Sequence, residues 1–311
     1  MTQWDVVVVG GANYDYLVRG SHLPTPGDTV NGNEFQEAPG GKGANQAVAA
    51  ARLGAKVALL ARIGKDTRGD TLMARFAAEG VDTSHVLRDA DAATGIALVH
   101  VTESGEKQIF VAPGANDQLT AADIADAAPL FANARVLLTQ LEIPQESVMA
   151  ALQQAKNAGL QTILDPAPPR ALPDKLLRLV DLIKPNSAEA KSITGIQVSD
   201  QNAAHKAAQA LLDKGIKTVA VQAGEAGNLL VWGEDERWLP RIEVDSVDAT
   251  GAGDAFAAAL AVALAEGRPL TEAGPFASAA AALTTTNVGA QAALPKRQTV
   301  LDLVEQSRVT A

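Results

Sequence analysis

The segment Asp248-Ala249-Thr250-Gly251-Ala252-Gly253-Asp254 leads into an apolar, alanine-rich run at residues 255–266. Glycines directly before a helix allow a tight turn and expose several N–H groups at the positive end of the helix dipole, which together bind an anion. An aspartate in an anion site repels the ligand, so Asp254 makes sense there if it takes a proton from a hydroxyl that attacks a phosphate. Taken alone, the pattern is equally consistent with a glycine-rich turn in which Asp254 caps the helix.

Upstream of this segment, strand and helix patterns alternate, which predicts an α/β fold with a parallel sheet and helices on both of its faces. We expect strands at residues 5–10, 56–64, 134–141, 161–165, 180–184 and 218–222. Helices are expected at residues 44–53, 67–79, 145–158, 187–194 and 202–214. Antiparallel strands are expected within residues 227–242, and helices at 253–266, at 271–285 and from residue 297 onward.

Two segments do not follow this alternation. Prolines and glycines interrupt residues 13–39, so this stretch cannot form a long helix and is expected to form short strands. Residues 94–100 and 107–112 flank a turn and predict a hairpin. We therefore predict a main domain made of residues 1–12, 40–93 and 113–311, and a discontinuous small β subdomain made of residues 13–39 and 94–112.

The composition excludes several classes of function. Of the 311 residues, 47% are hydrophobic and only 4% aromatic, which suits small aliphatic helices packed on a parallel sheet. A net charge of −10 gives no general attraction for nucleic acid or an anionic membrane, so neither is expected as a partner. The absence of cysteine excludes thiolate nucleophiles and disulfides. The amino-terminal sequence MTQWDVVVVGG resembles no signal peptide, and we expect a cytoplasmic enzyme.

A second glycine-rich segment, Gly40-Gly41-Lys42-Gly43-Ala44-Asn45, precedes a predicted helix. It lacks the G-x-x-x-x-G-K-[ST] spacing of a P-loop, which is also absent from the rest of the chain, so a kinase built on this chain is not a P-loop kinase. Closely spaced glycines let a ligand approach the backbone, and Lys42 and Asn45 are suited to contacts with hydroxyl groups. The alternative is a simple turn at the start of a helix, with Lys42 in water.

Further polar residues follow predicted strands. Asn13, Asp15 and Glu142 lie just beyond strand ends, where α/β enzymes bind ligands, although each is also compatible with a solvated loop. In the segment 184–190, Asn186 and Glu189 have the spacing of a helix capping box. The functional alternative is that they hold metal-bound water near phosphates. The spacing alone favours the capping box.

Together these segments resemble the ribokinase family of carbohydrate kinases (the PfkB superfamily), and the resemblance spans nearly the whole chain. The two signatures are GGKGANQAVAAARLGA at residues 40–55 and DATGAGDAF at residues 248–256. Asn13-Tyr14-Asp15 with LPTPGDTV (23–30), QLEIPQESV (140–148) and KPNSAEA (184–190) match as well. Because the motifs occur in the family's order, the resemblance favours a catalytic base at position 254 and ligand roles at positions 186 and 189.

The resemblance implies a three-layer αβα fold with a mostly parallel central sheet and a small β-sheet lid. It implies that the sugar hydroxyls are bound by Asn13, Asp15, Gly41, Lys42, Gly43, Asn45 and Glu142. Asp254 would be the base, and the amides of Gly251, Ala252, Gly253 and Asp254 would form an anion hole. ATP and Mg²⁺ would be served by Asn186, Glu189, Gln222, Gly224, Gly227, Gly253 and Ser278. A monovalent cation, usually K⁺, would lie at Asp248, Thr250, Thr284, Asn287 and Gly289.

Three positions depart from the family pattern. Gln222 replaces a common threonine before the nucleotide glycine, and Ser278 replaces a usual asparagine near the adenine. Ala293 replaces a usual serine at the last cation position. The departures therefore affect the positions implied for the nucleotide and the cation, whereas the positions implied for the sugar and the base show none.

The activity implied is transfer of the ATP γ-phosphoryl group to a sugar, with the 5-hydroxyl of D-ribose as the expected acceptor and a homodimer formed through the lid. Deoxyribose, fructose, another sugar or a nucleoside are the alternative acceptors. Asp15 and Lys42 favour a polyhydroxyl sugar over a nucleoside. Two other classes fit less well: an inactive binding protein would have lost Asp254, and a nicotinamide-binding G-x-G-x-x-G pattern would need glycine where Phe256 stands.

Overall fold

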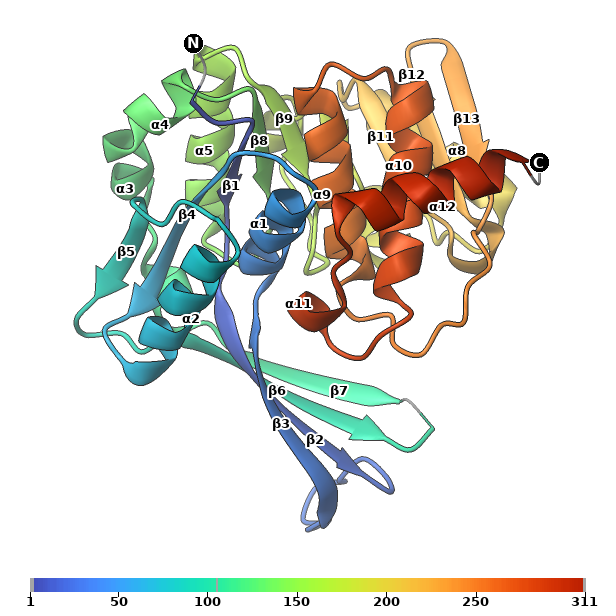
Figure 1. Cartoon of the computed structure of the whole chain (residues 1–311). Coiled ribbons are helices and arrows are strands. Elements are labelled where there is room, and N and C mark those ends of the chain that lie inside the picture. Colours follow the sequence, from blue (N-terminus) through green and yellow to red (C-terminus); the bar gives the residue numbers. More distant parts are fainter. Residues whose placement is uncertain (1–2, 105, 310–311) are drawn as a thin grey trace.

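The computed structural model describes residues 3–104 and 106–309 and contains a large and a small β-sheet (Figure 1). The large sheet has nine strands in the order β13-β12-β11-β10-β9-β8-β1-β4-β5. From the first of these to the last, their bounds are Asp235–Leu239, Asn228–Trp232, Thr218–Gln222, Leu182–Ile183, Gln161–Leu164, Val136–Thr139, Val6–Val9, Val57–Gly64 and Val86–Asp89. Pairing is parallel from β11 to β5, and β12 and β13 add antiparallel strands at one edge.

Both faces of the large sheet are covered by helices, as the apolar strand β1 requires. Val6 and Val8 pack into one hydrophobic core, and Val7 and Val9 into the other, because successive side chains of a strand point to opposite faces. The first core is covered by α1 (Lys42–Arg52), α2 (Thr67–Ala78), α9 (Ala252–Ala265), α10 (Leu270–Thr284) and α12 (Arg297–Val309). The second is covered by α3 (Ala121–Asp126), α4 (Ala128–Ala132), α5 (Gln145–Asn157), α6 (Asp174–Leu177), α7 (Ser187–Thr194) and α8 (Gln201–Leu212).

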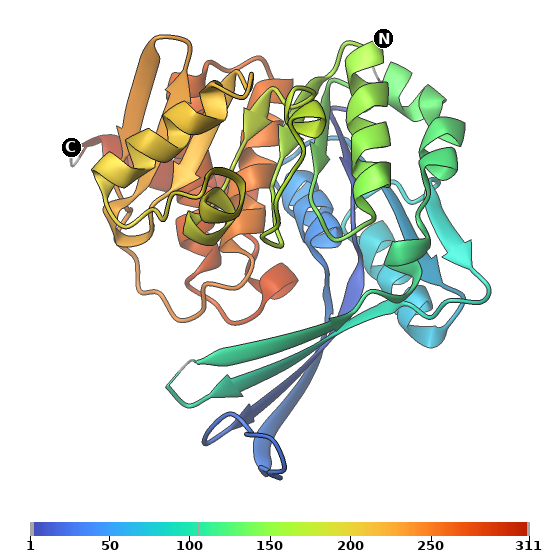
Figure 2. The ribbon, with the colours of Figure 1, turned by 180° about the vertical axis from the view of Figure 1, so that it is seen from behind.

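The small sheet projects from the main body of the molecule, as both views show (Figures 1 and 2). Its four strands have the order β3-β2-β6-β7, with bounds Gly32–Gly40, Asn13–Gly20, Gly95–Thr102 and Lys107–Ala112. The central pair, β2 and β6, is parallel, and the outer pairs are antiparallel. Phe35 and Phe110 are among the large apolar side chains that this sheet exposes.

The predicted α/β class, with a mostly parallel sheet and a second small sheet, is confirmed, and so is the hairpin formed by β6 and β7. The strand expected at residues 180–184 is shorter, because only Leu182 and Ile183 are in strand conformation. Pro185, which follows, has no amide N–H with which to extend the ladder. Strand β5 and the short helices α3, α4 and α6 were not predicted. In the described part of the chain, no helix is long and apolar enough to cross a membrane.

Candidate active site

The two glycine-rich segments meet at the carboxyl ends of the parallel strands. Helix α1 passes so close to the end of β1 that a Cβ atom on Gly43 would lie 2.6 Å from the carbonyl carbon of Gly10. A Cβ atom on Gly10 would in turn lie 1.9 Å from Oε1 of Gln140. Backbone packing therefore requires glycine at position 43, and the side chain of Gln140 leaves little room for a larger residue at position 10, whatever ligand binds nearby. This close approach brings the start of α1 to the start of α9.

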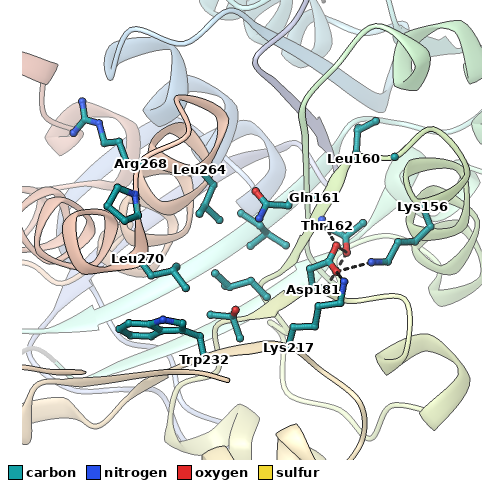
Figure 3. Close-up of a pocket in the computed structure, with 15 residues that line it drawn as sticks. Lys156, Leu160, Gln161, Thr162, Asp181, Lys217, Trp232, Leu264, Arg268 and Leu270 are labelled. Carbon is teal, nitrogen blue, oxygen red and sulfur yellow. Dashed lines mark hydrogen bonds and ion pairs between the residues drawn. The ribbon is translucent and has the colours of Figure 1, made fainter. Parts of the chain in front are cut away.

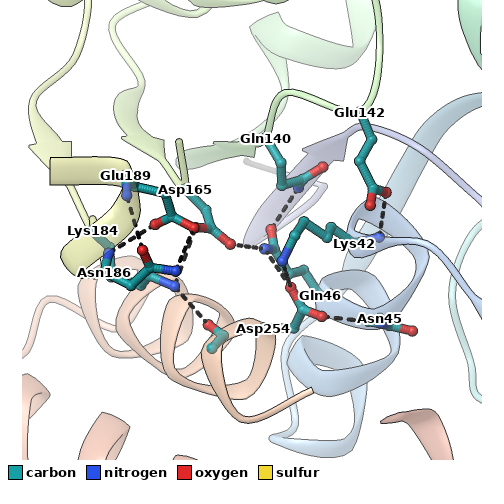
Figure 4. Close-up of polar contacts among 11 residues, drawn as sticks. Lys42, Asn45, Gln46, Gln140, Glu142, Asp165, Lys184, Asn186, Glu189 and Asp254 are labelled. Atoms are coloured by element: carbon teal, nitrogen blue, oxygen red, sulfur yellow. Dashed lines mark hydrogen bonds and ion pairs between the residues drawn. The ribbon is translucent and has the colours of Figure 1, made fainter. Parts of the chain in front are cut away.

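Asp254 lies in the first turn of α9 and points toward α1 (Figure 4). Its Oδ2 atom accepts a hydrogen bond from Nδ2 of Asn45 at 3.0 Å, and its Oδ1 atom accepts one from Nε2 of Gln46 at 3.1 Å. Nζ of Lys42 lies 3.6 Å from the same Oδ1 atom. The helix is capped instead by Gly251, whose φ of 83° is left-handed, and no side chain caps it. The interpretation of Asp254 as a helix cap is therefore wrong.

The side-chain amide of Gln46, beside Asp254, belongs to a buried polar network that the sequence did not reveal. Nε2 of Gln46 also donates to Oδ2 of Asp165 at 2.8 Å, and Oε1 of Gln46 accepts a hydrogen bond from Nε2 of Gln140. Asp165 pairs with Nζ of Lys184 at 3.1 Å, and Lys184 also donates to the carbonyl oxygen of Gly253. Asp165 directly follows strand β9, so the rule that selected Glu142 after β8 applies equally to it.

Lys42 lies among several carboxylates and remains positively charged. The carboxylate of Asp254 is the main cause that raises the pKa of Lys42 above its ordinary value; burial opposes this, and Asp165 and Glu142 add to the rise. The backbone N–H of Lys42 donates to Oε2 of Glu142 at 2.7 Å. The backbone of Lys42 therefore holds the carboxyl group of Glu142, and its side chain lies beside the carboxylate of Asp254.

Two carboxyl groups near Asp254 have raised pKa values. Burial raises the pKa of Glu142 to about 7, with Lys42 acting against it. Burial also raises the pKa of Asp15 to about 7, with further contributions from Glu142 and Asp254. Next to them, Oδ1 of Asn13 accepts a hydrogen bond from Nδ2 of Asn116 at 2.8 Å, a supporting residue that the sequence did not indicate. We call this cluster of polar side chains, together with Lys42, Asn45 and Asp254, the polar cup. Its donors and acceptors suit a ligand with many hydroxyl groups.

The backbone at the start of α9 presents unpaired donors. The N–H groups of Gly253 and Asp254 have no hydrogen-bond partner among the described residues, as is usual for the first turn of a helix. Gly253 also lines a groove with a volume of about 630 Å³. The groove is lined by the predicted nucleotide positions Asn186, Gln222, Gly224, Gly227, Gly253 and Ser278.

Asn186 and Glu189 form the capping box that their spacing indicates. The side chain of Asn186 accepts the N–H of Glu189 at 3.0 Å, and Glu189 accepts the N–H of Asn186 at 2.8 Å. Burial, together with the charge of Asp165, raises the pKa of Glu189. No group of three or more histidine and acidic side chains suited to a metal occurs in residues 3–104 and 106–309. Mg²⁺ is usually bound by one or two carboxylates together with water and substrate phosphates, and the buried carboxylate of Glu189, paired with Asn186 of the groove, is one ligand of that kind.

The predicted cation positions are partly gathered. Asp248 accepts the hydroxyl of Thr250 at 2.6 Å and the N–H of Gly289 at 2.9 Å. Although burial opposes it, these hydrogen bonds hold the pKa of Asp248 below its ordinary value. The hydroxyl of Thr284 donates to its own helix, at the carbonyl oxygen of Ala280, and Asn287 is exposed. Asp248, Thr250 and Gly289 therefore form one oxygen-rich cluster. Among the described residues, the side chains of Thr284 and Asn287 form their hydrogen bonds outside this cluster.

Comparison with known proteins shows which family this chain belongs to. The model of the pfkB family of carbohydrate kinases matches residues 3–297. The chain belongs to this family. It is 41% identical to the ribokinase of Haemophilus influenzae over 97% of this chain and 99% of that protein. It is 32% identical to the deoxyribokinase of Salmonella typhi over 94% and 95%. The structure of Arabidopsis thaliana ribokinase complexed with ribose and ATP matches 96% of this chain and 98% of that one, with a TM-score of 0.90 and 34% identity.

As a pfkB-family carbohydrate kinase, the protein is an enzyme that phosphorylates a sugar hydroxyl. Asp254 belongs to the polar cup through its contact with Asn45, and Gly253, the residue before it, lines the groove. A carbohydrate kinase needs this kind of junction, because the acceptor hydroxyl and the transferred phosphoryl group have to meet at one point.

Proposed function

We propose that this carbohydrate kinase transfers the γ-phosphoryl group of ATP to the 5-hydroxyl of D-ribose, with Asp254 as general base. The observation that supports this most directly is the position of Asp254, buried between the polar cup and the unpaired N–H groups of α9. The high identity to a ribokinase over nearly the full length supports ribose as the acceptor.

In the proposed mechanism the sugar lies in the cup and its hydroxyls contact Asn13, Asp15, Lys42, Asn45 and Glu142. Gly41 and Gly43 leave room for the sugar beside the backbone. The hydroxyl that attacks gives its proton to a carboxylate oxygen of Asp254 as its oxygen bonds to the γ-phosphorus and the bond to the ADP oxygen breaks. The N–H groups of Gly251, Ala252, Gly253 and Asp254 stabilise the negative charge on the transferring group, and the N–H of Ala252 has to leave the carbonyl oxygen of Ala249, 3.2 Å away, to take part. Lys42 stays cationic and orients the sugar rather than the phosphate.

Two cations are part of the proposal. Mg²⁺, held near Asn186 and Glu189 through water, would neutralise charge on the ATP phosphates when bound. K⁺ would bind beside Asp248, Thr250 and Gly289, with Thr284 and Asn287 nearby, and would hold the turn before α9 in place. Ala293, without a side-chain oxygen, removes one donor from this site.

The small sheet is proposed to act as a lid, formed by residues 13–39 and 94–112, that closes over the sugar and excludes water. Nζ of Lys107 already lies 3.4 Å from the hydroxyl of Thr250, so the lid touches the turn before α9. The exposed apolar side chains of the lid, Phe35, Leu98, Ile109, Phe110 and Val111, would be buried in a homodimer. We also propose a cytoplasmic location.

The acceptor is tested with purified protein, MgATP, KCl and a panel of sugars and nucleosides. D-Ribose is expected to have the highest kcat/KM, with 2-deoxyribose, fructose and adenosine well below it. Product analysis by NMR should place the phosphate on the 5-hydroxyl. Replacement of K⁺ by tetramethylammonium is expected to lower kcat. Higher kcat/KM for a nucleoside than for any free sugar would contradict the acceptor assignment, and turnover indifferent to K⁺ would contradict the cation site.

The raised pKa values of Asp15 and Glu142 predict a pH dependence. Below their pKa values of about 7 both groups take up protons and lose the charge that accepts hydrogen bonds from sugar hydroxyls. At saturating MgATP, kcat/KM for ribose is therefore expected to fall as the pH is lowered from 8 to 5.5, by up to about tenfold per pH unit for each group. Asp15→Asn should reduce kcat/KM at pH 8 and flatten the profile, whereas Asp126→Asn, at an exposed position, should leave it unchanged. A flat wild-type profile would refute this.

A further inference from the structure

A second cavity lies at the edge of the large sheet opposite the candidate active site (Figure 3). It has a volume of about 700 Å³ and opens beside Gln161 and Thr218, the first residues of β9 and β11. Strand β12 connects the two regions, because its first residue, Asn228, lines the groove and its last residue, Trp232, lines this cavity. Because β12 spans five residues, the groove and this cavity lie roughly 13 Å apart. The cavity is therefore not part of the phosphoryl-transfer site.

One end of the cavity is basic. The carboxylate of Asp181 pairs with Nζ of Lys156 at 2.6 Å and with Nζ of Lys217 at 2.9 Å. It also accepts a hydrogen bond from the N–H of Thr162 at 3.1 Å. Although burial opposes it, the two ammonium groups hold the pKa of Asp181 below its ordinary value. One carboxylate thus fixes two cations side by side and neutralises only one of them. The excess positive charge is notable in a chain with a net charge of −10.

The other end is apolar. Figure 3 shows Trp232, Leu264 and Leu270 together on the side away from the lysines, with Gln161 between the two ends. Arg268 points away from the cavity, since its guanidinium pairs with Glu266 and lies 4.9 Å from the centre of the Phe276 ring. We therefore leave Arg268 out of the binding groups. A half-buried indole with two leucines offers a flat apolar surface on which a ring can stack.

We propose that this cavity binds a small organic anion with a planar ring, of the nucleoside monophosphate class. The ring would lie against Trp232 and Leu270, and the phosphate would contact Lys156 and Lys217. The volume is within the usual range for small-molecule sites, and the separation of an aromatic end from a basic end matches the two halves of such a ligand. Leu264, near the carboxyl end of α9, lines the cavity, and Asp254 lies in the first turn of the same helix. The ligand would therefore contact the helix that carries the proposed base, but not the reacting groups.

The test uses Trp232 as its reporter. The chain has three tryptophans, and in a Trp4→Phe/Trp238→Phe variant only Trp232 fluoresces. Titration with AMP is expected to change its emission in a saturable way, whereas adenosine and inorganic phosphate, each with half of the ligand, should bind at least about tenfold more weakly. Lys217→Met should weaken AMP binding roughly tenfold and leave the KM for ATP unchanged. The control Lys206→Met removes an exposed lysine outside the cavity and should change nothing.

If the double tryptophan variant is unstable, calorimetry gives the same comparison. AMP is then titrated into the parent protein and into Trp232→Leu, both with the nucleotide groove saturated by a non-hydrolysable ATP analogue. Binding to the parent that is weakened in Trp232→Leu and in Lys217→Met supports the proposal. No saturable signal up to about 10 mM AMP, or equal affinity in the parent and in Lys217→Met, would overturn it.

Discussion

Asp254→Asn is expected to lower kcat for ribose by a factor of about 10²–10⁴, the usual contribution of a positioned general base. Asparagine has nearly the same shape, and its amide oxygen can still accept a hydrogen bond from Asn45 or Gln46, which now hold the carboxylate at 3.0 and 3.1 Å. It cannot take the proton of the sugar hydroxyl. The loss should therefore appear in kcat, with the KM for ribose and for ATP within a few-fold of the wild-type values.

A structural explanation of such a loss has to be separated from a chemical one. Calorimetric titration should show that Asp254→Asn still binds ribose, and its melting temperature should stay close to that of the wild type. Gln46→Met is the control, because it removes one donor to the same carboxylate, together with the hydrogen bonds of Gln46 to Asp165 and Gln140, and leaves the carboxylate of Asp254 in place. Its kcat should exceed that of Asp254→Asn by at least about tenfold. Full turnover by Asp254→Asn would exclude this residue as the base.

The sequence was informative where one local pattern has one structural meaning. The alternation of apolar runs with helical stretches predicted the parallel sheet, because β1 has four buried valines that only a two-sided core can accept. The range predicted for strand β10 is too long, because an apolar run of residues does not show where the hydrogen-bonded ladder ends. The parallel pairing of β2 with β6 could not be predicted, because these strands are far apart in the chain and no turn joins them.

At the site, the glycine-rich segments could be found from their spacing, but the side chains that hold Asp254 could not. Gln46 and Gln140 are glutamines of ordinary appearance, and only the close approach of α1 to β1 buries them. The capping box of Asn186 and Glu189 shows the opposite limit. Its local role is present in the structure, and the same side chains border the groove or lie beside it. A local role therefore does not exclude a functional one.

Lys184→Met is expected to reduce the free energy of unfolding by about 3–5 kcal/mol, the usual cost of removing one partner of a buried ion pair. The side chain of Lys184 is 3% exposed and that of Asp165 is fully buried. Without Lys184, Oδ1 of Asp165 loses its ion-pair partner, and the described residues offer it no hydrogen-bond donor as a replacement. Lys42 also acts on Asp165, but its main partner is Asp254. The change is measured by urea denaturation followed by circular dichroism.

The matched control is Lys217→Met, which breaks an ion pair of similar length whose lysine is 74% exposed. Exposed pairs contribute only about 0–1 kcal/mol, and Asp181 keeps Lys156 as a partner. The double variant Asp165→Asn/Lys184→Met should be more stable than Lys184→Met alone, because the penalty comes from an uncompensated buried charge and not from a missing attraction. If the double variant is as unstable as the single one, the loss does not come from the uncompensated charge of Asp165. It then comes from the other contacts of Lys184, among them its hydrogen bond to the carbonyl oxygen of Gly253 at 3.3 Å, which joins Lys184 to the start of α9.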